Sequence, residues 1–358
     1  MDFNRKSALL FSAKVLLFLK SCRATGGPET ISPDIQASQE APAELKGDGS
    51  QAGFVYGAVN EPVIVLWSSP GLNRDYDRLI LNKPVNPSVW AAGMDTEMRL
   101  WLVGKAETQA VFGEPVVILE RQGDWIKVAA TKQKTSLSEY GYPGWVPAGH
   151  IVTNQIYLTE LENLPNAVAA KPVIKLYQNK ELTGASVEIC YQTRLPILGE
   201  CEKYVSVRLP DGNTGYLSSQ DIKRARELSF SRDEIINEAK SFLGVRYIWA
   251  GTASYGFDCS GFTMRLYQSQ GVTISRDADE QAKEGVAVAK IELLPGDLIF
   301  FAAKGGQGQI HHVGLYAGEG MMIHSPSSSS SVRLDGIDSG MYHVEYWGAK
   351  RYVPALPA

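Results

Sequence analysis

Short apolar runs separated by turn residues dominate the chain from about residue 54 to residue 154. Runs of this kind, rich in Val, Ile and Trp and bounded by Gly, Asp and Pro, predict β-strands. The predicted strands are residues 62–67, 116–119, 125–129 and 144–147. Residues 90–102 break this pattern with a helical or irregular spacing, so we expect an insertion there.

A second, smaller set of strands is predicted between about residues 156 and 223. Near its end, residues 211–213 (Asp-Gly-Asn) form a turn signal. The following residues 215–217 (Gly-Tyr-Leu) echo residues 144–146 (Gly-Trp-Val) of the first set. The order of apolar strand, Gly-Asp-Trp, strand and Gly-Trp-Val-Pro in the first set resembles bacterial SH3-like barrels. We therefore expect two small all-β units in succession.

The last third of the chain combines helical and strand-like patterns. Residues 231–234 (Ser-Arg-Asp-Glu) are a capping signature for a helix that continues through Leu243. A second amphipathic helix is predicted after the capping residue Asp258, and Gly271 ends it. Residues 309–316 and 321–325 read as strands.

Cys259 falls in the first turn of that second predicted helix. The helix dipole and the unsatisfied N–H groups at this position favour a thiolate, which is the nucleophilic form of cysteine. A single cysteine is more often a small buried hydrophobe. The histidines favour the nucleophile here, because four of the five (His311, His312, His324 and His343) follow Cys259. A nucleophilic thiol needs a base nearby, and the base needs a group that orients it.

Strand alternation selects the base between the two adjacent histidines. His311 shares a face with Val313 and Leu315, which belong in the core, whereas His312 points to the opposite, accessible face. Gly314 on that face leaves room beside the ring. If residues 317–319 form a three-residue hairpin loop, position 312 lies opposite His324, which could orient it. An even-numbered loop would separate the two rings.

Four motifs, in this order and spacing, resemble the NlpC family of bacterial cell-wall cysteine peptidases. They are residues 258–262 (Asp-Cys-Ser-Gly-Phe), 294–298 (Leu-Pro-Gly-Asp-Leu), 312–316 (His-Val-Gly-Leu-Tyr) and His324. The intervals of 53 residues from Cys259 to His312 and 12 residues from there to His324 are similar to those of the family. The resemblance implies an α+β fold: a papain-like NlpC catalytic domain at 228–358, preceded by two small all-β SH3-like barrels.

The same resemblance implies the roles of several residues. Cys259, His312 and His324 match the catalytic positions, and no cofactor is implied. Tyr247, in the matching Tyr-x-Trp segment, is expected to donate a hydroxyl near the nucleophile and stabilise the oxyanion. Without the resemblance, Tyr247 is equally well a core aromatic residue. The implied reaction is hydrolysis of the bond between D-γ-glutamyl and a diamino acid in the murein stem.

The three-part order with a large first barrel resembles γ-D-glutamyl-L-diamino acid endopeptidases that act on released peptides with a free N-terminal L-alanine. The ammonium of such a substrate needs a carboxylate and hydrogen-bond acceptors in a closed pocket. The candidates for the ammonium are Asp258 beside the nucleophile and Glu107 with Tyr142 in the first barrel. Further substrate-binding candidates are Ser260 beside the nucleophile and Arg276, Asp277 and Ala278 in a predicted helix start. Arg276 is the candidate partner for the D-glutamyl carboxylate, whereas Ala278 offers only its backbone. Each polar residue could also be a solvated surface group.

Composition and charge restrict the other functions. The 358 residues carry a formal net charge of −4, which gives no reason to expect a nucleic-acid partner. The histidines have no i, i+4 pair with nearby acidic ligands, so we expect no metal. Cys190 and Cys201 could form a disulfide in an exported protein or remain two buried thiols. A non-catalytic wall-binding protein and an acyltransferase or amidase on the same scaffold are the alternative functions.

The N-terminus has the pattern of an export signal. A basic start and a short apolar run occupy residues 1–22, and Cys22 follows small Ser21 as in lipoprotein signals, although Lys14 and Lys20 are unusual there. Residues 23–53 have the composition of a flexible tether. The predicted domains are then 54–155, 156–227 and 228–358. We expect a periplasmic or lipid-anchored protein with membrane contact only through Cys22. The sequence leaves three questions open: whether the diamino acid is lysine or diaminopimelate, whether the substrate is the intact wall or free peptides, and what the oligomeric state is.

Overall fold

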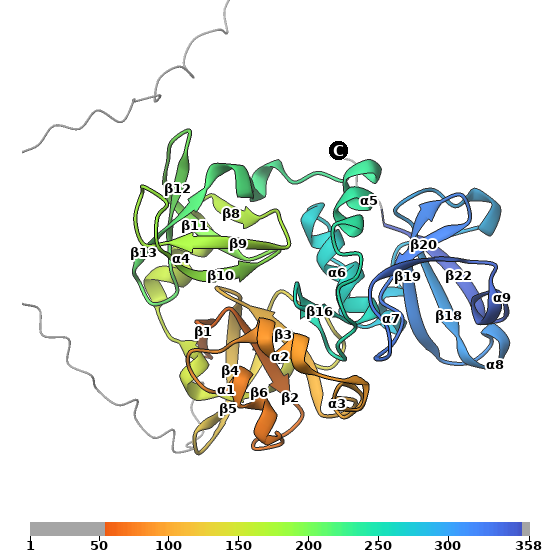
Figure 1. Cartoon of the computed structure of the whole chain (residues 1–358), viewed down its shortest axis with the longest axis horizontal. Helices are drawn as coiled ribbons and strands as arrows, with labels where there is room; N and C mark the ends of the chain where they lie inside the picture. The colour runs from red at the N-terminus through yellow and green to blue at the C-terminus, as the bar shows by residue number, and fades with distance from the viewer. Residues whose placement is uncertain (1–53, 353–358) are drawn as a thin grey trace, which may run out of the picture. The chain divides into compact units, whose positions relative to one another are not determined.

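The computed structural model describes residues 54–352, whose helices and strands are labelled in Figure 1. The predicted signal at 1–22, Cys22 and the tether at 23–53 lie outside the described residues. Within residues 54–352, no helix has the length and apolar character needed to cross a bilayer.

The first predicted β-unit is a seven-stranded antiparallel sheet in the order β3-β2-β6-β5-β4-β1-β7. Its strands are β1 (Val55–Val59), β2 (Val63–Trp67), β3 (Ala106–Val111), β4 (Pro115–Gln122), β5 (Trp125–Ala130), β6 (Tyr142–Pro147) and β7 (Ile151–Val152). The insertion predicted at residues 90–102 is longer in the structure, where the connection between β2 and β3 contains α1 (Arg78–Leu81), α2 (Pro87–Gly93) and α3 (Thr96–Leu100). The sequence prediction missed β1, β3 and β7, and β3 is the strand that reaches the site.

The second β-unit repeats the strand order of the first, position by position. After α4 (Gln155–Asn163) its sheet runs β10-β9-β13-β12-β11-β8-β14. Its strands are β8 (Asn166–Ala169), β9 (Val173–Tyr177), β10 (Ala185–Cys190), β11 (Arg194–Glu200), β12 (Tyr204–Arg208), β13 (Thr214–Ser218) and β14 (Ile222–Arg224). The strands of the two sheets fall inside the predicted ranges 54–155 and 156–227, while the exact domain limits stay a prediction. Cys190 is a free, fully buried thiol, so the disulfide with Cys201 is not formed.

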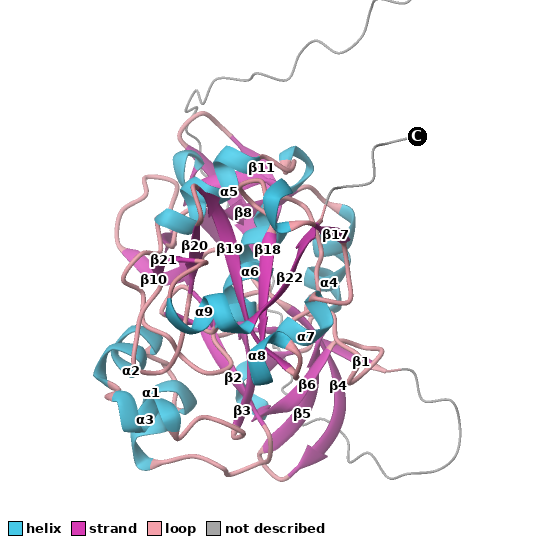
Figure 2. Cartoon of the chain, turned by 90° about the vertical axis from the view of Figure 1, so that its right-hand side faces the viewer, coloured by secondary structure: helices cyan, strands magenta, loops and turns pink. Residues whose placement is uncertain are grey.

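The third unit is a six-stranded antiparallel sheet, β17-β22-β18-β19-β20-β21, with helices packed against it (Figure 2). Its strands are β17 (Val286–Val288), β18 (Leu298–Ala302), β19 (Ile310–Gly318), β20 (Met321–His324), β21 (Arg333–Gly336) and β22 (Tyr346–Arg351). The helices are α5 (Arg232–Lys240), α6 (Cys259–Ser269), α7 (Ala278–Gln281), α8 (Ala303–Gly306) and α9 (Gly340–Glu345). A small hairpin, β15 (Thr252–Ala253) and β16 (Gly256–Phe257), precedes α6.

Helix α6 lies at the centre of the described chain. Both predicted caps are formed, since Ser231 accepts the N–H of Glu234 at the start of α5 and Asp258 accepts the N–H of Gly261 at the start of α6. The prediction of an amphipathic α6 is wrong, because every α6 residue except Gln268 is buried. The helix contacts β19 of the six-stranded sheet as well as α5 and β15, so it has no solvent face.

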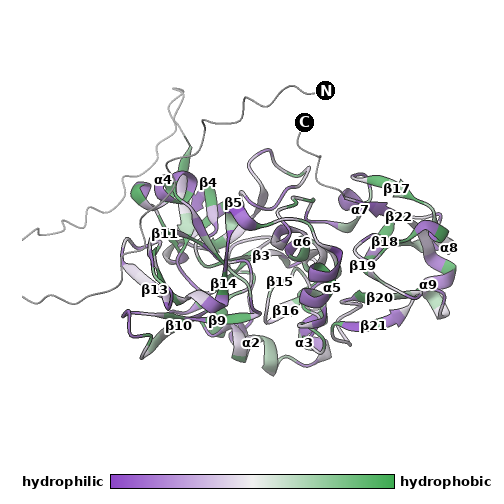
Figure 3. Ribbon diagram, turned by 90° about the horizontal axis from the view of Figure 1, so that it is seen from above, coloured by the Kyte–Doolittle hydropathy of each residue, from purple (hydrophilic) through white to green (hydrophobic). Residues whose placement is uncertain are grey.

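The last two strands of the six-stranded sheet differ in polarity. The inner strand β20 is apolar and the edge strand β21 is polar, as their green and purple colours show in Figure 3. Charged residues on an edge strand oppose pairing with another sheet. One of them, Asp335, points at the histidine pair described below.

Candidate active site

Cys259 is the first residue of α6, directly after its cap Asp258. Only 8% of its surface is exposed. The backbone N–H of Val313 in β19 hydrogen-bonds the thiol. Because Val313 follows His312, this contact places the nucleophile beside the predicted base.

The predicted thiolate is not favoured in the free enzyme. Burial and the negative charge of Asp258 raise the pKa of the Cys259 thiol to about 12, although the Val313 N–H and Arg276 act in the opposite direction. The helix terminus supplies N–H groups, as predicted, but desolvation of the charged form has the larger effect. The thiol is therefore neutral at rest and must lose its proton during the reaction.

His312 and His324 meet as predicted, but through a different strand register. The hairpin between β19 and β20 turns at Glu319 and Gly320, both with positive φ, instead of at residues 317–319. Tyr316 pairs with Met322, so His324 faces Gly314, and a Cβ at Gly314 would approach that of His324 to 3.3 Å. Gly314 thus leaves the room that the prediction assigned to it.

The two histidine rings are in direct contact despite this offset. The distance from His312 Nε2 to His324 Nδ1 is 2.7 Å. The pairing of β18 with β19 shifts between Phe301–His312 and Ala302–Ile310, which is a bulge at His311. Bulges re-aim side chains next to active sites, and this one adjoins the His312 ring.

Asp335 extends the pair into a chain of hydrogen bonds that the sequence prediction missed. Its Oδ2 lies 3.0 Å from His324 Nε2 and accepts a further hydrogen bond from Arg333 at 2.8 Å. A carboxylate can only accept, so His324 carries its proton on Nε2 and accepts on Nδ1. His312 must then donate from Nε2, which leaves its Nδ1 as the basic nitrogen. The sequence could not show that Asp335 pairs with His324, because the loop between β20 and β21 leaves the register of these two strands open.

Both histidines are neutral in this environment. Burial and the nearby His324 lower the pKa of His312 well below its usual value. Burial also lowers the pKa of His324 to about 4, against the opposing effect of Asp335. The rings of Phe301 and Tyr342 lie 5.7 Å and 6.2 Å from His312, centroid to centroid, and exclude water from it. The side of the strand that was predicted to be accessible is therefore also buried, and His312 is only 5% exposed.

Tyr247 lies close to the nucleophile, where the resemblance places it. Burial and the charges of Cys259 and Asp258 raise the pKa of its hydroxyl, so it stays a hydrogen-bond donor. Its backbone is fixed by a bridge to Phe257 and by a bond from its N–H to the carbonyl of Ser330. Main-chain contacts on two sides thus fix the position of the Tyr247 backbone.

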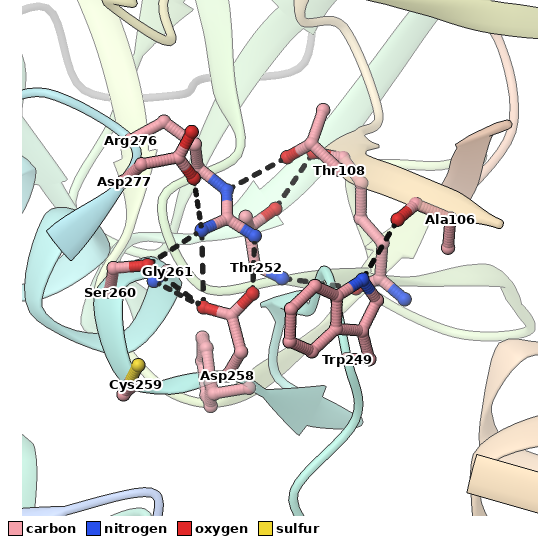
Figure 4. A network of polar contacts seen from close by, with 12 residues as sticks. Ala106, Thr108, Trp249, Thr252, Asp258, Cys259, Ser260, Gly261, Arg276 and Asp277 are labelled. Atoms are coloured by element: carbon pink, nitrogen blue, oxygen red, sulfur yellow. Dashed lines mark hydrogen bonds and ion pairs between the residues drawn. The ribbon is translucent and has the colours of Figure 1, made fainter. Parts of the chain in front are cut away.

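Arg276 has a different environment from the predicted one. It is 1% exposed, and its guanidinium donates to Asp258 at 2.5 and 3.1 Å, to Ser260 at 2.9 Å and to Thr108 at 3.0 Å (Figure 4). All three nitrogens have partners within the protein, and the prediction that Arg276 binds a substrate carboxylate stays a prediction. Arg276 holds the cap of α6 in place.

Asp258 and Ser260 belong to the same buried network (Figure 4). Asp258 caps α6 with a 2.7 Å bond from the Gly261 N–H, while its other oxygen accepts from Arg276. Oδ1 accepts from three donors and Oδ2 from one, and the prediction that Asp258 also binds the substrate ammonium stays a prediction. Ser260 is 5% exposed and donates to Asp258, which leaves it no free donor for a substrate. Ala278 begins α7 and offers only backbone groups, as expected.

Glu107, Tyr142 and Asp277 come together at the edge of the site. The Tyr142 hydroxyl donates to Asp277 Oδ2 at 3.0 Å. Asp277 is the capping residue of α7 but makes no side-chain cap bond, so its carboxylate is directed to Tyr142 instead. Burial and the charge of Asp277 raise the pKa of Glu107, while burial also raises the pKa of Asp277. Two partly buried carboxylates with raised pKa values form a site that a cation would stabilise. We call these three residues the acidic corner.

Strand β3 positions Glu107 by docking against the segment before α6. The indole of Trp249 donates to the carbonyl of Ala106 at 3.0 Å, and Thr252 donates to the carbonyl of Gln109 at 2.8 Å (Figure 4). Thr108, which lies between Ala106 and Gln109 in β3, accepts a hydrogen bond from Arg276. The first β-unit therefore supplies one wall of the site.

These features define a class of protein. A cysteine at the start of a central helix, beside histidines on an antiparallel sheet, is the arrangement of papain-like cysteine peptidases, with a base and an orienting group in place. Within residues 54–352, no group of three or more His, Cys, Asp or Glu side chains could hold a metal ion.

Known proteins agree with this class. Residues 244–351 match the NlpC/P60 family, and residues 170–224 match the YKFC SH3b2 domain. The chain is 42% identical over 295 residues to gamma-D-glutamyl-L-lysine dipeptidyl-peptidase of Bacillus cereus (strain ATCC 10987 / NRS 248), with 81% of this chain and 88% of that protein covered. The protein of the same name from Bacillus subtilis (strain 168) is 31% identical over 288 residues, with 80% and 95% covered.

A solved structure agrees as well. The crystal structure of an NlpC/P60 family protein from Bacillus cereus ATCC 10987 has a TM-score of 0.80 and 40% identity, and the match covers 84% of this chain and 100% of that one. The chain belongs to the NlpC/P60 family of cysteine peptidases. It combines a papain-like cell-wall peptidase fold with preceding SH3-like units, which confirms the predicted fold class. The non-catalytic alternative is set aside.

Proposed function

We propose that this peptidase hydrolyses the bond between D-γ-glutamyl and a diamino acid in released murein peptides that carry a free N-terminal L-alanine. The observation that carries the proposal is the acidic corner, because its two carboxylates and one hydroxyl suit an ammonium group. The two Bacillus relatives are named dipeptidyl-peptidases, which cut after a free N-terminal dipeptide. A corner that binds the N-terminus accounts for this position of cleavage.

The proposed chemistry begins with proton transfer from Cys259 to Nδ1 of His312. The sulfur then attacks the γ-D-glutamyl carbonyl carbon, and the C=O bond becomes an oxyanion that the Tyr247 hydroxyl and the Cys259 N–H stabilise. Because the thiol and the imidazole are both neutral at rest, general-base transfer replaces a preformed ion pair. Asp335 stabilises the imidazolium through His324.

The second half of the reaction uses the same imidazole. Protonated His312 donates to the nitrogen of the departing diamino acid as the C–N bond breaks, which leaves a thioester on Cys259. Water then loses a proton to His312 and attacks the thioester, which releases L-alanyl-γ-D-glutamate and restores the thiol. One histidine thus acts as base, acid and base again.

Acetylation of the substrate N-terminus tests the substrate assignment. We expect L-Ala-γ-D-Glu-diaminopimelate to be cleaved and its N-acetylated form to lose about 100-fold or more in kcat/KM, because one buried charge-assisted contact is worth about 1.5–3 kcal/mol and the acyl group also needs space. Mass spectrometry of the products measures both. Equal cleavage of the two peptides would contradict the assignment.

A matched variant locates the effect in the acidic corner. Glu107→Gln should raise KM for the free peptide by about 10-fold or more while changing kcat little, because Glu107 binds the substrate end and takes no part in the chemistry. Its effect on the acetylated peptide should be small. The lysine and diaminopimelate forms of the tripeptide, compared side by side, decide which diamino acid is preferred.

Asp335→Asn tests the chain of hydrogen bonds behind the base. We expect kcat/KM to fall about 10- to 100-fold, since one hydrogen bond to a charged group is lost and the amide can donate to His324 and reverse its tautomer. The acidic limb of the pH–rate profile should move to lower pH, because Asp335 raises the pKa of His324. A loss of activity with an unmoved profile would assign Asp335 to folding alone.

We also propose that the enzyme acts outside the cytoplasmic membrane. The support is the export pattern of residues 1–22, with lipid attachment at Cys22 as one form of it. Fractionation of cells that make the full chain and a Cys22→Ala variant separates secretion from lipid anchoring.

A further inference from the structure

Helix α9 packs against strand β18 of the six-stranded sheet, and its residue Tyr342 reaches both catalytic histidines. The centroid of the Tyr342 ring lies 6.2 Å from that of His312, with the two planes stacked at 30°. The His324 ring lies 5.2 Å away and stands edge-on to Tyr342 at 79°. None of the four sequence motifs contains Tyr342, so no local pattern marks it. One side chain outside the motifs therefore contacts the base and the ring that orients the base.

Tyr342 also meets two other groups around this pair of rings. Its ring lies 5.2 Å from that of Phe301, which itself lies 5.7 Å from His312. Burial and the charge of Asp335 raise the pKa of the Tyr342 hydroxyl, which places the hydroxyl near the carboxylate that ends the hydrogen-bonded chain. Phe301 is fully buried, whereas Tyr342 is half-buried, so Tyr342 is the ring that stands between the histidines and water.

The helix that carries Tyr342 is tied to the strand that carries the base. Oε2 of Glu345, the last residue of α9, lies 3.1 Å from Nε2 of His311 in β19. Glu345 comes three residues after Tyr342 and shares its face of the helix, so both side chains meet β19. His311 is the bulged residue beside His312. The bulge therefore directs one histidine to Glu345 and leaves the other under the ring of Tyr342.

We propose that Tyr342 is a positioning residue for the catalytic base: its ring holds the His312 imidazole in the orientation that contacts His324, and it keeps water from the face of that imidazole. The proposal deepens the proposed function and rests on the roles of Cys259 and His312 given there. Water at the ring would stabilise the imidazolium, and a protonated imidazole cannot accept the proton of Cys259. An imidazole that rotates would also lose the 2.7 Å contact with His324. Tyr342 thus acts on the reaction through His312.

Titratable and charged groups lie around the pair of rings on five elements. They are His311 on β19, His324 on β20, Arg333 and Asp335 on β21, Glu345 on α9 and Cys259 on α6. Burial is the largest cause of the lowered pKa of His312, and both neighbouring histidines act in the same direction. Removal of the Tyr342 ring therefore raises the pKa of His312, because the gain in hydration outweighs the lost attraction between the tyrosine face and an imidazolium.

Tyr342→Ala in the full chain tests the proposal. We expect kcat for L-Ala-γ-D-Glu-diaminopimelate to fall about 10- to 100-fold and KM to change less than about 2-fold, since part of the contribution of a general base is lost while the substrate contacts stay. The acidic limb of the pH–rate profile should move up by about one pH unit, opposite to the shift expected of Asp335→Asn. A lower rate with an unmoved acidic limb would assign Tyr342 to folding alone and overturn the proposal.

NMR of the full chain with isotope-labelled histidines reads the same effect without substrate. The signals of His312 are assigned by their loss in His312→Gln. We expect His312 to stay neutral down to a lower pH in the parent than in Tyr342→Ala, and an unchanged titration would overturn the proposal. A parent chain that cleaves no murein peptide would instead refute the proposed function, while the titration still tests the role of Tyr342.

Three further variants separate the ring of Tyr342 from its hydroxyl and from general loosening of the fold. Tyr342→Phe keeps the ring and should stay within about 3-fold of the parent in kcat. Tyr342→Leu keeps apolar bulk and should shift the acidic limb in the same direction as Tyr342→Ala, but less. Tyr346→Ala removes a ring from the same apolar cluster that has no ring contact with either histidine within residues 54–352, so it should leave the limb in place. A loss in Tyr342→Phe equal to that in Tyr342→Ala, or an equal shift in Tyr346→Ala, would overturn the proposal.

Discussion

Replacement of Cys259 by alanine is expected to lower kcat/KM for L-Ala-γ-D-Glu-diamino acid peptides by about 10⁴-fold or more, because no other group in the site can form the thioester. The fold should survive. The substitution removes one sulfur from a residue that is 8% exposed and leaves the helix cap Asp258 intact, so the loss of stability should be about 1 kcal/mol. Single-turnover assays with mass spectrometry, together with circular dichroism, measure both effects.

Cys190 offers a matched control for this experiment. It is also a buried thiol, and burial raises its pKa to about 11, yet it lies in the second β-unit beside Ser254. Cys190→Ala should lose a similar amount of stability and retain the full rate. If Cys259→Ala retained turnover above the background of the uncatalysed peptide, the assignment of the nucleophile would be wrong. A thiol-specific alkylating reagent should inactivate the parent slowly, because the Cys259 thiol is neutral at rest.

The sequence was sufficient to locate the nucleophile and the two histidines. Residue type, helix capping and strand alternation are local properties, and they predict Cys259 on α6 and His312 and His324 on neighbouring strands. The register of the hairpin was predicted incorrectly by two residues. The two histidines still meet, because a shift of two keeps every side chain on the same face of the sheet. An error of one residue would have separated them.

The charged groups around the site could not be placed in this way. A charge in a sequence gives no direction by itself, so Arg276 was predicted to face the substrate although it faces the interior. Its partners Thr108 and Asp258 are 168 and 18 residues away in the chain, and no local pattern connects them. Asp335 was missed for the same reason. The thiol pKa also depends on burial, which local sequence does not report.

In the two β-units, the repeat is clear from the strand order but hardly visible in the sequence. Their strand orders are identical, but the sequence contained only one short echo at residues 144–146 and 215–217. Backbone hydrogen bonding and the alternation of buried positions define such a sheet, and many side chains satisfy both. The first unit supplies β3 to the site through the hydrogen bond between Thr108 and Arg276.

Replacement of Arg276 by alanine is expected to cause the largest loss of stability of any single substitution proposed. It leaves the Asp258 carboxylate, which is 7% exposed, without its cation, and breaking a buried pair on one side costs about 3–5 kcal/mol. Ser260 and Thr108 also lose their donor. Denaturant unfolding followed by fluorescence should show the decrease in midpoint, and activity should fall because the cap of α6 and the wall formed by β3 both lose their anchor.

A double substitution decides whether the unpaired charge is the cause of that loss. Arg276→Met with Asp258→Asn removes both charges, keeps most of the buried volume and retains a good helix cap, because asparagine caps as well as aspartate. The double variant should therefore be more stable than Arg276→Met or Asp258→Asn alone, with a coupling of about 1–3 kcal/mol. Arg78→Ala breaks the exposed ion pair with Asp75 and should leave the midpoint unchanged. Additive effects in the cycle would show that packing, and not charge, makes Arg276 necessary.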